Sequence, residues 1–236
     1  MKLLLLSNST MKGEEYLRYP MPMISNFLGK ESLKGAFIPY AGVTISYDDY
    51  ESKVKLRFSE LGHQIESVHK SDSPIDAVNN ADFIVVGGGN SFMLLHQLYE
   101  TDLLRVIKNK VAEGIPYIGW SAGSNMACPS IKTTNDMPIV YPVSFDALSL
   151  ISFQINPHYT EKTIEGHGGE SRLDRLSEFI VANPEVKVAC LEEGCAIEVC
   201  NEDIKYFGKK DLLILSANNN KTYIKANSLF PDGLGL

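Results

Sequence analysis

The chain has 236 residues, which suits one domain with a sizeable core better than two. Its 44% hydrophobic and 22% charged content is that of an ordinary globular protein, and its formal net charge of −7 argues against nucleic acid or an anionic membrane as the main partner. The first apolar run is too short for a signal peptide, no segment is long enough to span a membrane, and the four cysteines form no metal-binding pattern. We therefore expect a single cytoplasmic domain over residues 1–236 with reduced cysteines.

Short apolar runs alternate with amphipathic segments through the first half of the chain. Strands are predicted over residues 3–6, 36–39, 64–69, 82–86 and 116–119. Helices are predicted over residues 14–28 (broken or late-starting because of two prolines), from a cap at Thr44 or Ser46 to Leu61, and over residues 74–80, 91–99 and 102–113. This alternation predicts βαβ units, and so a mostly parallel central sheet with helices on both faces.

The pattern loosens after residue 130. Residues 133–154 are rich in turn formers, and a helix is predicted over residues 171–182. Short β-type runs then follow at residues 186–191, 196–199, 212–215 and 222–224. We expect these runs to form an antiparallel C-terminal extension of the same sheet.

The segment Gly119-Trp120-Ser121-Ala122-Gly123 fits the pattern G-x-S-x-G between a strand and a helix that begins near its last glycine. In a nucleophile elbow of this form, a serine sits on a sharp turn and the glycines leave room for a strained backbone. The helix that follows brings backbone N–H groups near a developing oxyanion. A glycine- and serine-rich turn with no catalytic role fits the string equally well.

A second glycine-rich segment, residues 87–90, ends a predicted central strand at the edge where ligand sites gather in open α/β sheets. It lacks the spacing of a phosphate-binding loop. The alternatives are a tight turn or half of an oxyanion hole. In the second, the N–H groups of Gly88 and Gly89 would stabilise the oxyanion together with the N–H group of Ala122. Asn90, at the end of this segment, is a candidate substrate-binding residue.

A serine nucleophile needs a base, and His158 is the best placed histidine because it follows a strand-like run and a proline-fixed turn. We expect His63 to lie at the surface, because it follows the helix-ending Gly62. The other histidines are predicted at a strand end, in an amphipathic helix and in a glycine-rich loop: His69, His96 and His167.

An imidazole base is oriented by an acid, and two segments offer one. Asp136 would give the chain order Ser, Asp, His, whereas Glu192 or Glu193 would give Ser, His, Glu. In α/β-hydrolases the acid usually lies far past the serine and the histidine lies near the C-terminus. This chain has a long tail after His158, and so it does not fit that fold.

A longer, ordered set of segments runs from the N-terminus to about Gly194: LLLLSNST, FIPYAGVT, IVVGGGNSF, YIGWSAGSNMACPSIKTTNDMPIV, QINPHYT, EGHGGESR and LEEG. Together these segments resemble the peptidase E family, the aspartyl dipeptidases. That family is similar in fold to the flavodoxin-like class I glutamine amidotransferases, with serine in place of their cysteine at the elbow.

The resemblance implies hydrolysis of small acidic dipeptides with N-terminal aspartate (Asp-Xaa), without a metal or cofactor. It implies that Ser121 is the nucleophile, that His158 is the base and that Asp136 or Glu193 is the third member. Glu193 matches better than Glu192 because it directly precedes the glycine. The resemblance also implies that Arg172 binds the aspartate carboxylate of the substrate, a role that suits a guanidinium fork.

Two other functions are compatible with the same residues. One is a related hydrolase that acts on isoaspartyl bonds or longer acidic peptides, and the other is a non-catalytic small-molecule-binding protein that keeps the elbow. A homodimer is also compatible with the sequence, which contains no pattern that requires one.

Overall fold

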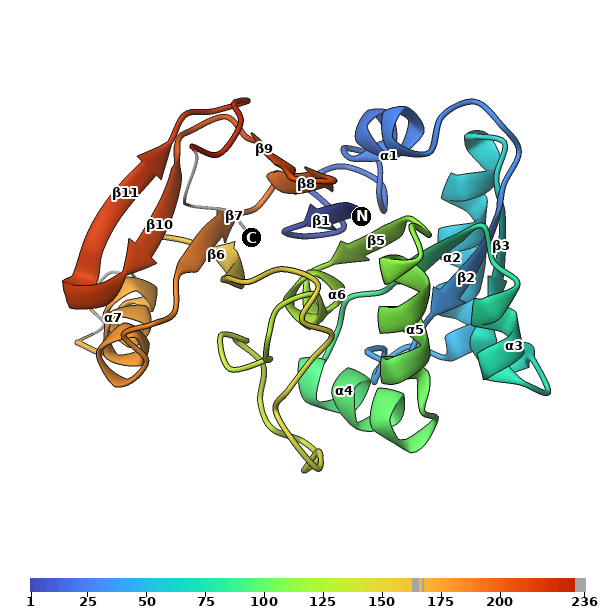
Figure 1. Ribbon diagram of the computed structural model, residues 1–236, viewed down its shortest axis with the longest axis horizontal. Helices are drawn as coiled ribbons and strands as arrows, with labels where there is room; N and C mark the ends of the chain where they lie inside the picture. Colours follow the sequence, from blue (N-terminus) through green and yellow to red (C-terminus); the bar gives the residue numbers. More distant parts are fainter. Residues whose placement is uncertain (163–165, 167, 232–236) are drawn as a thin grey trace.

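The larger of two sheets has seven strands, in the order β3-β2-β4-β5-β1-β8-β9, in a computed structural model that describes residues 1–162, 166 and 168–231 (Figure 1). Strands β1 to β5 pair in parallel, and β8 and β9 add an antiparallel hairpin beside β1. The bounds are β1 (Lys2–Leu6), β2 (Lys34–Ile38), β3 (Gln64–Ser67), β4 (Phe83–Val86), β5 (Tyr117–Trp120), β8 (Ala196–Cys200) and β9 (Asp203–Phe207). The predicted α/β class with a mostly parallel sheet is confirmed.

Helices cover both faces of this sheet because its central strands are apolar on both sides. The side chains of Leu4 and Leu6 pack with α1 (Met21–Leu28) and α2 (Tyr47–Glu60). The side chains of Leu3 and Leu5 lie in the core on the opposite face, with the remaining helices of the first half. Those helices are α3 (Pro74–Asn79), α4 (Ser91–Glu100), α5 (Leu103–Ala112) and the short α6 (Ala122–Met126).

The C-terminal tail divides between two sheets, which corrects the expected single extension. Only β8 and β9 extend the central sheet, whereas three other strands of the tail join β6 in a four-stranded sheet of order β11-β10-β7-β6. In this second sheet β6 and β7 are parallel and the other pairs are antiparallel. The bounds are β6 (Gln154–Tyr159), β7 (Val188–Glu192), β10 (Leu212–Ser216) and β11 (Asn220–Ile224).

Strands β6, β7 and β10 of the second sheet are buried on both faces, whereas β11 at its edge is mostly exposed. Helix α7 (Arg172–Ala182) covers one face through Leu176 and Ile180. From the other face, Ile155 and Ile214 enter the same apolar cluster as Leu5 of the central sheet. One continuous core therefore lies between the sheets and holds β6 beside the end of β1.

Local capping agrees with several predicted boundaries. Ser46, rather than Thr44, caps α2 by accepting a hydrogen bond from the N–H group of Asp49. Ser171 and Asp174 form a reciprocal capping box at the start of α7. Helix α1 begins only at Met21, after Pro20, as expected of a late-starting helix. Among the described residues, no helix is long and apolar enough to cross a membrane.

The sequence predicts that His63 lies at the surface, but the structure places it in the core. The chain turns back after α2 and places the imidazole edge-on to the ring of Phe83, with only 2% of the residue exposed. Neither ring nitrogen makes a well-formed hydrogen bond to a described residue, although the nearby backbone of Glu31 partly favours the charged form. Burial lowers the pKa of His63 because the charged imidazolium is poorly solvated there.

This burial predicts a loss of stability in mild acid. The unfolded chain binds the proton of His63 at about pH 6.5, whereas the folded chain binds it only at lower pH. Stability is therefore complete above that value and falls as the pH drops below it. We expect a His63→Phe variant to lose less unfolding free energy than the wild type between about pH 7.5 and pH 5.5, as measured by urea denaturation. An equal loss in both proteins would contradict the assignment.

Candidate active site

Ser121 stands at a sharp turn between β5 and α6. Its backbone has φ 53° and ψ −114°, a conformation that costs energy for any residue with a side chain. The Ser121 N–H group donates to the carbonyl of Leu6 at 3.1 Å, and its own carbonyl accepts from Ser124 and Asn125. These bonds at the end of β1 and the start of α6 hold the strained residue in place.

The two glycines of the elbow are required by close backbone contacts. A Cβ atom on Gly119 would lie 2.5 Å from the carbonyl oxygen of Gly123. A Cβ atom on Gly123 would overlap the carbonyl oxygen of Val86, at the end of the neighbouring strand β4. Only glycine at both positions therefore lets α6 start this close to the sheet.

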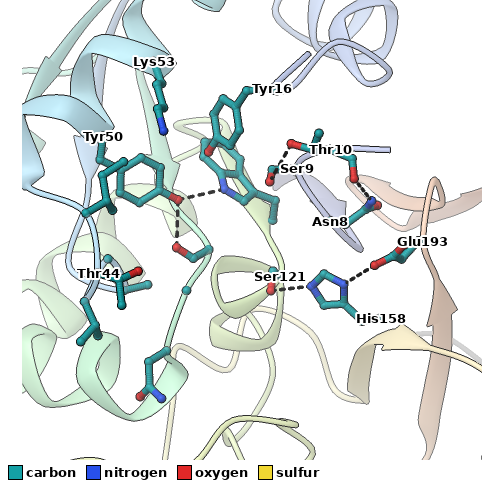
Figure 2. Close-up of a pocket in the computed structure, with 18 residues that line it drawn as sticks. Asn8, Ser9, Thr10, Tyr16, Thr44, Tyr50, Lys53, Ser121, His158 and Glu193 are labelled. Atoms are coloured by element: carbon teal, nitrogen blue, oxygen red, sulfur yellow. Dashed lines mark hydrogen bonds and ion pairs between the residues drawn. The ribbon is translucent and has the colours of Figure 1, made fainter. Parts of the chain in front are cut away.

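Ser121, His158 and Glu193 form one hydrogen-bonded chain (Figure 2). The Nε2 atom of His158 lies 2.8 Å from Ser121 Oγ, and its Nδ1 atom lies 2.9 Å from Glu193 Oε1. Because the carboxylate can only accept when ionised, Nδ1 carries the proton and Nε2 is left to accept the proton of the serine. This is the arrangement of nucleophile, base and orienting acid.

His158 reaches the serine through an irregularity in β6. The strand continues to Tyr159, past the turn expected at Pro157, and its register with β7 shifts between these residues. His158 itself adopts a left-handed φ of 54°, which turns its side chain out of the strand alternation. Its N–H group donates to Ser7 Oγ at 2.9 Å, and the same hydroxyl donates to the carbonyl of Leu191 at 2.8 Å.

Ser7 and Asn8 are site residues that the sequence analysis missed. Both are buried at the end of β1. The Asn8 side-chain oxygen accepts from the N–H group of Gly194 at 2.8 Å, next to Glu193, and also accepts from Tyr19. The available signal was a polar run that directly follows a buried strand, at the edge of the sheet where ligands bind.

Of the two candidate acids, Glu193 contacts His158, whereas Asp136 forms its hydrogen bonds elsewhere. One carboxylate oxygen of Asp136 accepts from the N–H group of Ser91 at 2.7 Å and from Thr134 Oγ1 at 3.0 Å. This carboxylate therefore stabilises the first turn of α4, because negative charge is favourable at the N-terminus of a helix. Glu192, the third acid considered, pairs with Lys210 at 3.2 Å instead.

The segment after β4 lies beside the serine. A Cβ atom on Gly88 would lie 3.0 Å from Ser121 Cβ, and Gly89 has a φ of 136° that glycine tolerates best. Among the described residues, the N–H groups of Gly88 and Gly89 have no acceptor. Ala122 is the first residue of α6, so its N–H group has no hydrogen-bond acceptor within the helix. Gly88 therefore adjoins Ser121 in space, and Ala122 follows Ser121 directly in the chain.

Aromatic side chains support the glycine segment from behind. The Tyr50 hydroxyl donates to the carbonyl of Gly88 at 2.9 Å and accepts from Trp120 Nε1 at 3.1 Å. Burial raises the pKa of Tyr50, so its hydroxyl keeps the proton that it donates. With the Gly88 carbonyl held in this way, the N–H groups of the segment are fixed in orientation.

A cavity of about 500 Å³ opens over Ser121, His158 and Glu193. It lies between the loops that follow β1, β2, β4 and β5, where the strand order changes direction. Gly88, Gly89 and Asn90 line it. The Asn90 side chain, however, caps α4 at Met93 and donates to the carbonyl of Met137 at 2.8 Å, so part of its role is structural.

Arg172 lies outside this cavity. It lines a separate cavity of about 230 Å³ together with Asp136, Asn156 and Arg175. Burial and the nearby Arg175 lower the pKa of the Arg172 guanidinium. Arg172 and Asp136 thus line the same cavity, and Arg172 is not among the residues that line the cavity over Ser121.

The remaining polar candidates lie elsewhere. His69 is bonded to Ser67 at 2.6 Å beyond the end of β3, and His96 lies within α4. His167 lies outside the described residues. All four cysteines are free thiols, and the described part of the chain contains no group of three or more His, Cys, Asp or Glu residues placed to hold a metal ion.

A model of peptidase family S51 matches residues 3–207. The chain belongs to peptidase family S51. Among its curated relatives, Peptidase E of Nostoc sp. is 50% identical over 93% of this chain and 91% of the relative. Peptidase E of Pasteurella multocida is 45% identical over 97% of this chain and 98% of the relative. The protein is therefore a serine-type peptidase, which confirms the resemblance seen in the sequence.

The fold of this S51 peptidase also occurs in solved structures. The crystal structure of a peptidase from an acI-B1 Actinobacterium matches it with a TM-score of 0.72 at 17% identity, over 97% of this chain and 96% of the other. At that identity the likeness concerns the fold alone.

The glycine contacts predict that the S51 peptidase needs Gly123 for both folding and activity. We expect Gly123→Ala to lower the free energy of unfolding by about 1–3 kcal/mol, because the new methyl group must displace Val86 or α6. It should also slow hydrolysis by moving Ser121. Gly168→Ala is the control, since no atom of the described residues lies within 4 Å of a Cβ atom there. Equal stability of the two variants in urea denaturation would disprove the packing argument.

Proposed function

We propose that this enzyme hydrolyses dipeptides with an N-terminal aspartate, Asp-Xaa, through an acyl-enzyme formed on Ser121. The observation that carries the proposal is the chain of hydrogen bonds from Ser121 Oγ through His158 to Glu193. The name Peptidase E of its relatives at 45–50% identity and its resemblance to the aspartyl dipeptidases support this substrate class. A cavity of about 500 Å³ is of the size that holds a small ligand.

The first half of the reaction forms the acyl-enzyme. Ser121 Oγ attacks the carbonyl carbon of the Asp-Xaa bond while its proton passes to His158 Nε2, and the carbonyl oxygen becomes an anion. The N–H groups of Gly88, Gly89 and Ala122 stabilise that anion. The C–N bond then breaks as His158 gives its proton to the leaving amine, which departs as the free second amino acid.

The second half releases aspartate. Water takes the place of the departed amine and gives a proton to His158 while its oxygen attacks the acyl carbon. The ester bond breaks, Ser121 recovers its proton from His158, and free aspartate leaves. Throughout both halves Glu193 accepts the Nδ1 hydrogen bond and stabilises the transient imidazolium.

The relative rates of cleavage of a few peptides distinguish the alternative functions. An enzyme for isoaspartyl bonds would cleave β-Asp-Leu faster than α-Asp-Leu, and one for longer acidic peptides would cleave Asp-Leu-Gly as fast as Asp-Leu. A non-catalytic binding protein would cleave none of these peptides. The aligned serine and imidazole argue against the last alternative, because that geometry serves proton transfer.

Removal of the nucleophile gives the most direct test. We expect Ser121→Ala to fold normally and to lose at least about 10³-fold in kcat on Asp-Leu. A fluorophosphonate probe should label the wild type and leave the variant unlabelled, as read by intact-protein mass spectrometry. Normal turnover by the variant would refute the acyl-enzyme.

The assignment of the acid predicts opposite behaviour of two conservative variants. Glu193→Gln should lower kcat by about 100-fold or more, because an amide can stabilise the wrong tautomer of His158. Asp136→Asn should keep most of the activity and lose about 0.5–2 kcal/mol of stability, because it weakens the cap of α4. If Asp136→Asn lost activity while Glu193→Gln kept it, the roles would have to be exchanged.

A further inference from the structure

The cavity over Ser121 contains one cationic side chain among the described Lys and Arg residues that line it, and this is Lys53 of α2. The Lys53 ammonium makes no hydrogen bond or ion pair with any described residue. Lys70, which lies beyond the other face of α2, is instead held by Asp48 at 2.8 Å and Glu51 at 2.5 Å. Lys53 is thus a cation at this cavity that no carboxylate of the described residues neutralises.

The position of Lys53 relative to the triad decides which part of a substrate it can meet. In Figure 2, Lys53 and Tyr50 lie on one side of Ser121, and His158 and Glu193 lie on the other. The leaving amine must lie beside His158, because that imidazole gives it a proton. The residue on the acyl side of the scissile bond therefore points toward the end of the cavity that Lys53 occupies.

The wall at this end strengthens a charge interaction. Tyr16, Tyr50 and Trp120 line it and pack edge to face, with Tyr16 and Trp120 ring centres 6.3 Å apart. Lys53 is itself exposed, so water screens its charge in the free enzyme. A substrate that fills the cavity against these apolar surfaces lowers the local dielectric and strengthens the attraction between the ammonium and a carboxylate. In a protein of net charge −7, a local cation is what makes such a site attractive to an anionic group.

We infer that Lys53 binds the side-chain carboxylate of the N-terminal aspartate and so sets the preference for an acidic first residue. This inference rests on the proposed function. It gives Lys53 the role that the sequence resemblance assigns to Arg172, which lines the other cavity. Lys53 acts in binding and takes no part in proton transfer.

The test compares Lys53→Met with Lys55→Met. Lys55 is an exposed lysine on the same helix that lines a different cavity, so its variant controls for the loss of one charge from α2. We expect Lys53→Met to reduce the ratio of kcat/KM for Asp-Leu over Asn-Leu by about 10- to 100-fold, mainly through KM, because one charge-assisted hydrogen bond is lost. Lys55→Met should keep the wild-type ratio, and Lys53→Arg should recover part of it.

If Lys53→Met kept the wild-type ratio of kcat/KM for Asp-Leu over Asn-Leu, the inference would be overturned. This would hold even if an Arg172→Met variant lowered that ratio. It would also be overturned if the variant lost only its discrimination between Asp-Leu and Asp-Leu amide, since Lys53 would then bind the terminal carboxylate. Circular dichroism and an unchanged rate of fluorophosphonate labelling would show that the variant is folded.

A second readout separates this inference from the proposed function. Free aspartate, but not asparagine, should protect wild-type Ser121 from the fluorophosphonate, and Lys53→Met should lose that protection. If the wild type failed to cleave Asp-Leu, the proposed function would fail, while the protection experiment would still decide the role of Lys53. Equal protection of wild type and variant by aspartate would refute the role.

Discussion

The Ser7 hydroxyl joins the two sheets at the point where the chemistry takes place. Ser121 belongs to the central sheet, whereas His158 and Glu193 belong to β6 and to the turn after β7, in the second sheet. Ser7, at the end of β1, accepts from the backbone of His158 and donates to the backbone of Leu191. The distance between Ser121 and His158 therefore depends on how the sheets dock. Ser7 is a polar contact within this largely apolar interface, together with Asn125, which donates to the carbonyl of Ile155 at 3.0 Å.

Backbone strain is concentrated at the same point. Ser121 and His158 both have positive φ angles, and each is held by hydrogen bonds to the first strand or the residue after it. Residues in such conformations persist only where their surroundings determine them fully. The rigid central strands and the contacts of Gly119 and Gly123 supply that support, so the reactive groups are oriented before any substrate arrives.

Much of this arrangement could be predicted from the sequence, because periodicity and turn chemistry are local. The G-x-S-x-G elbow, the glycine segment after β4 and the cap at Ser171 depend on neighbours within a few residues. The choice between Asp136 and Glu193 depends on contacts between distant segments. Asp136 accepts from Ser91, 45 positions earlier, and no local pattern reveals that contact.

The errors have the same origin. Strands β7 and β8 have similar apolar composition, yet one joins the second sheet and the other pairs with β1, because partner choice is settled by packing. Gly62 correctly predicts the end of α2. It does not reveal that the next residue, His63, packs against the ring of Phe83 and is buried. The polar pair Ser7 and Asn8 has the composition of a loop, while its function comes from residues more than 140 positions away.

The separation of the reactive groups along the chain also bears on biosynthesis. Among the described strands β1 is made first, whereas its antiparallel neighbour β8 and the turn that carries Glu193 are made only after β7. Until that turn is made, the chain of hydrogen bonds from Ser121 through His158 to Glu193 cannot form. The three side chains therefore come together only after both sheets have been synthesised as far as Glu193 and have docked.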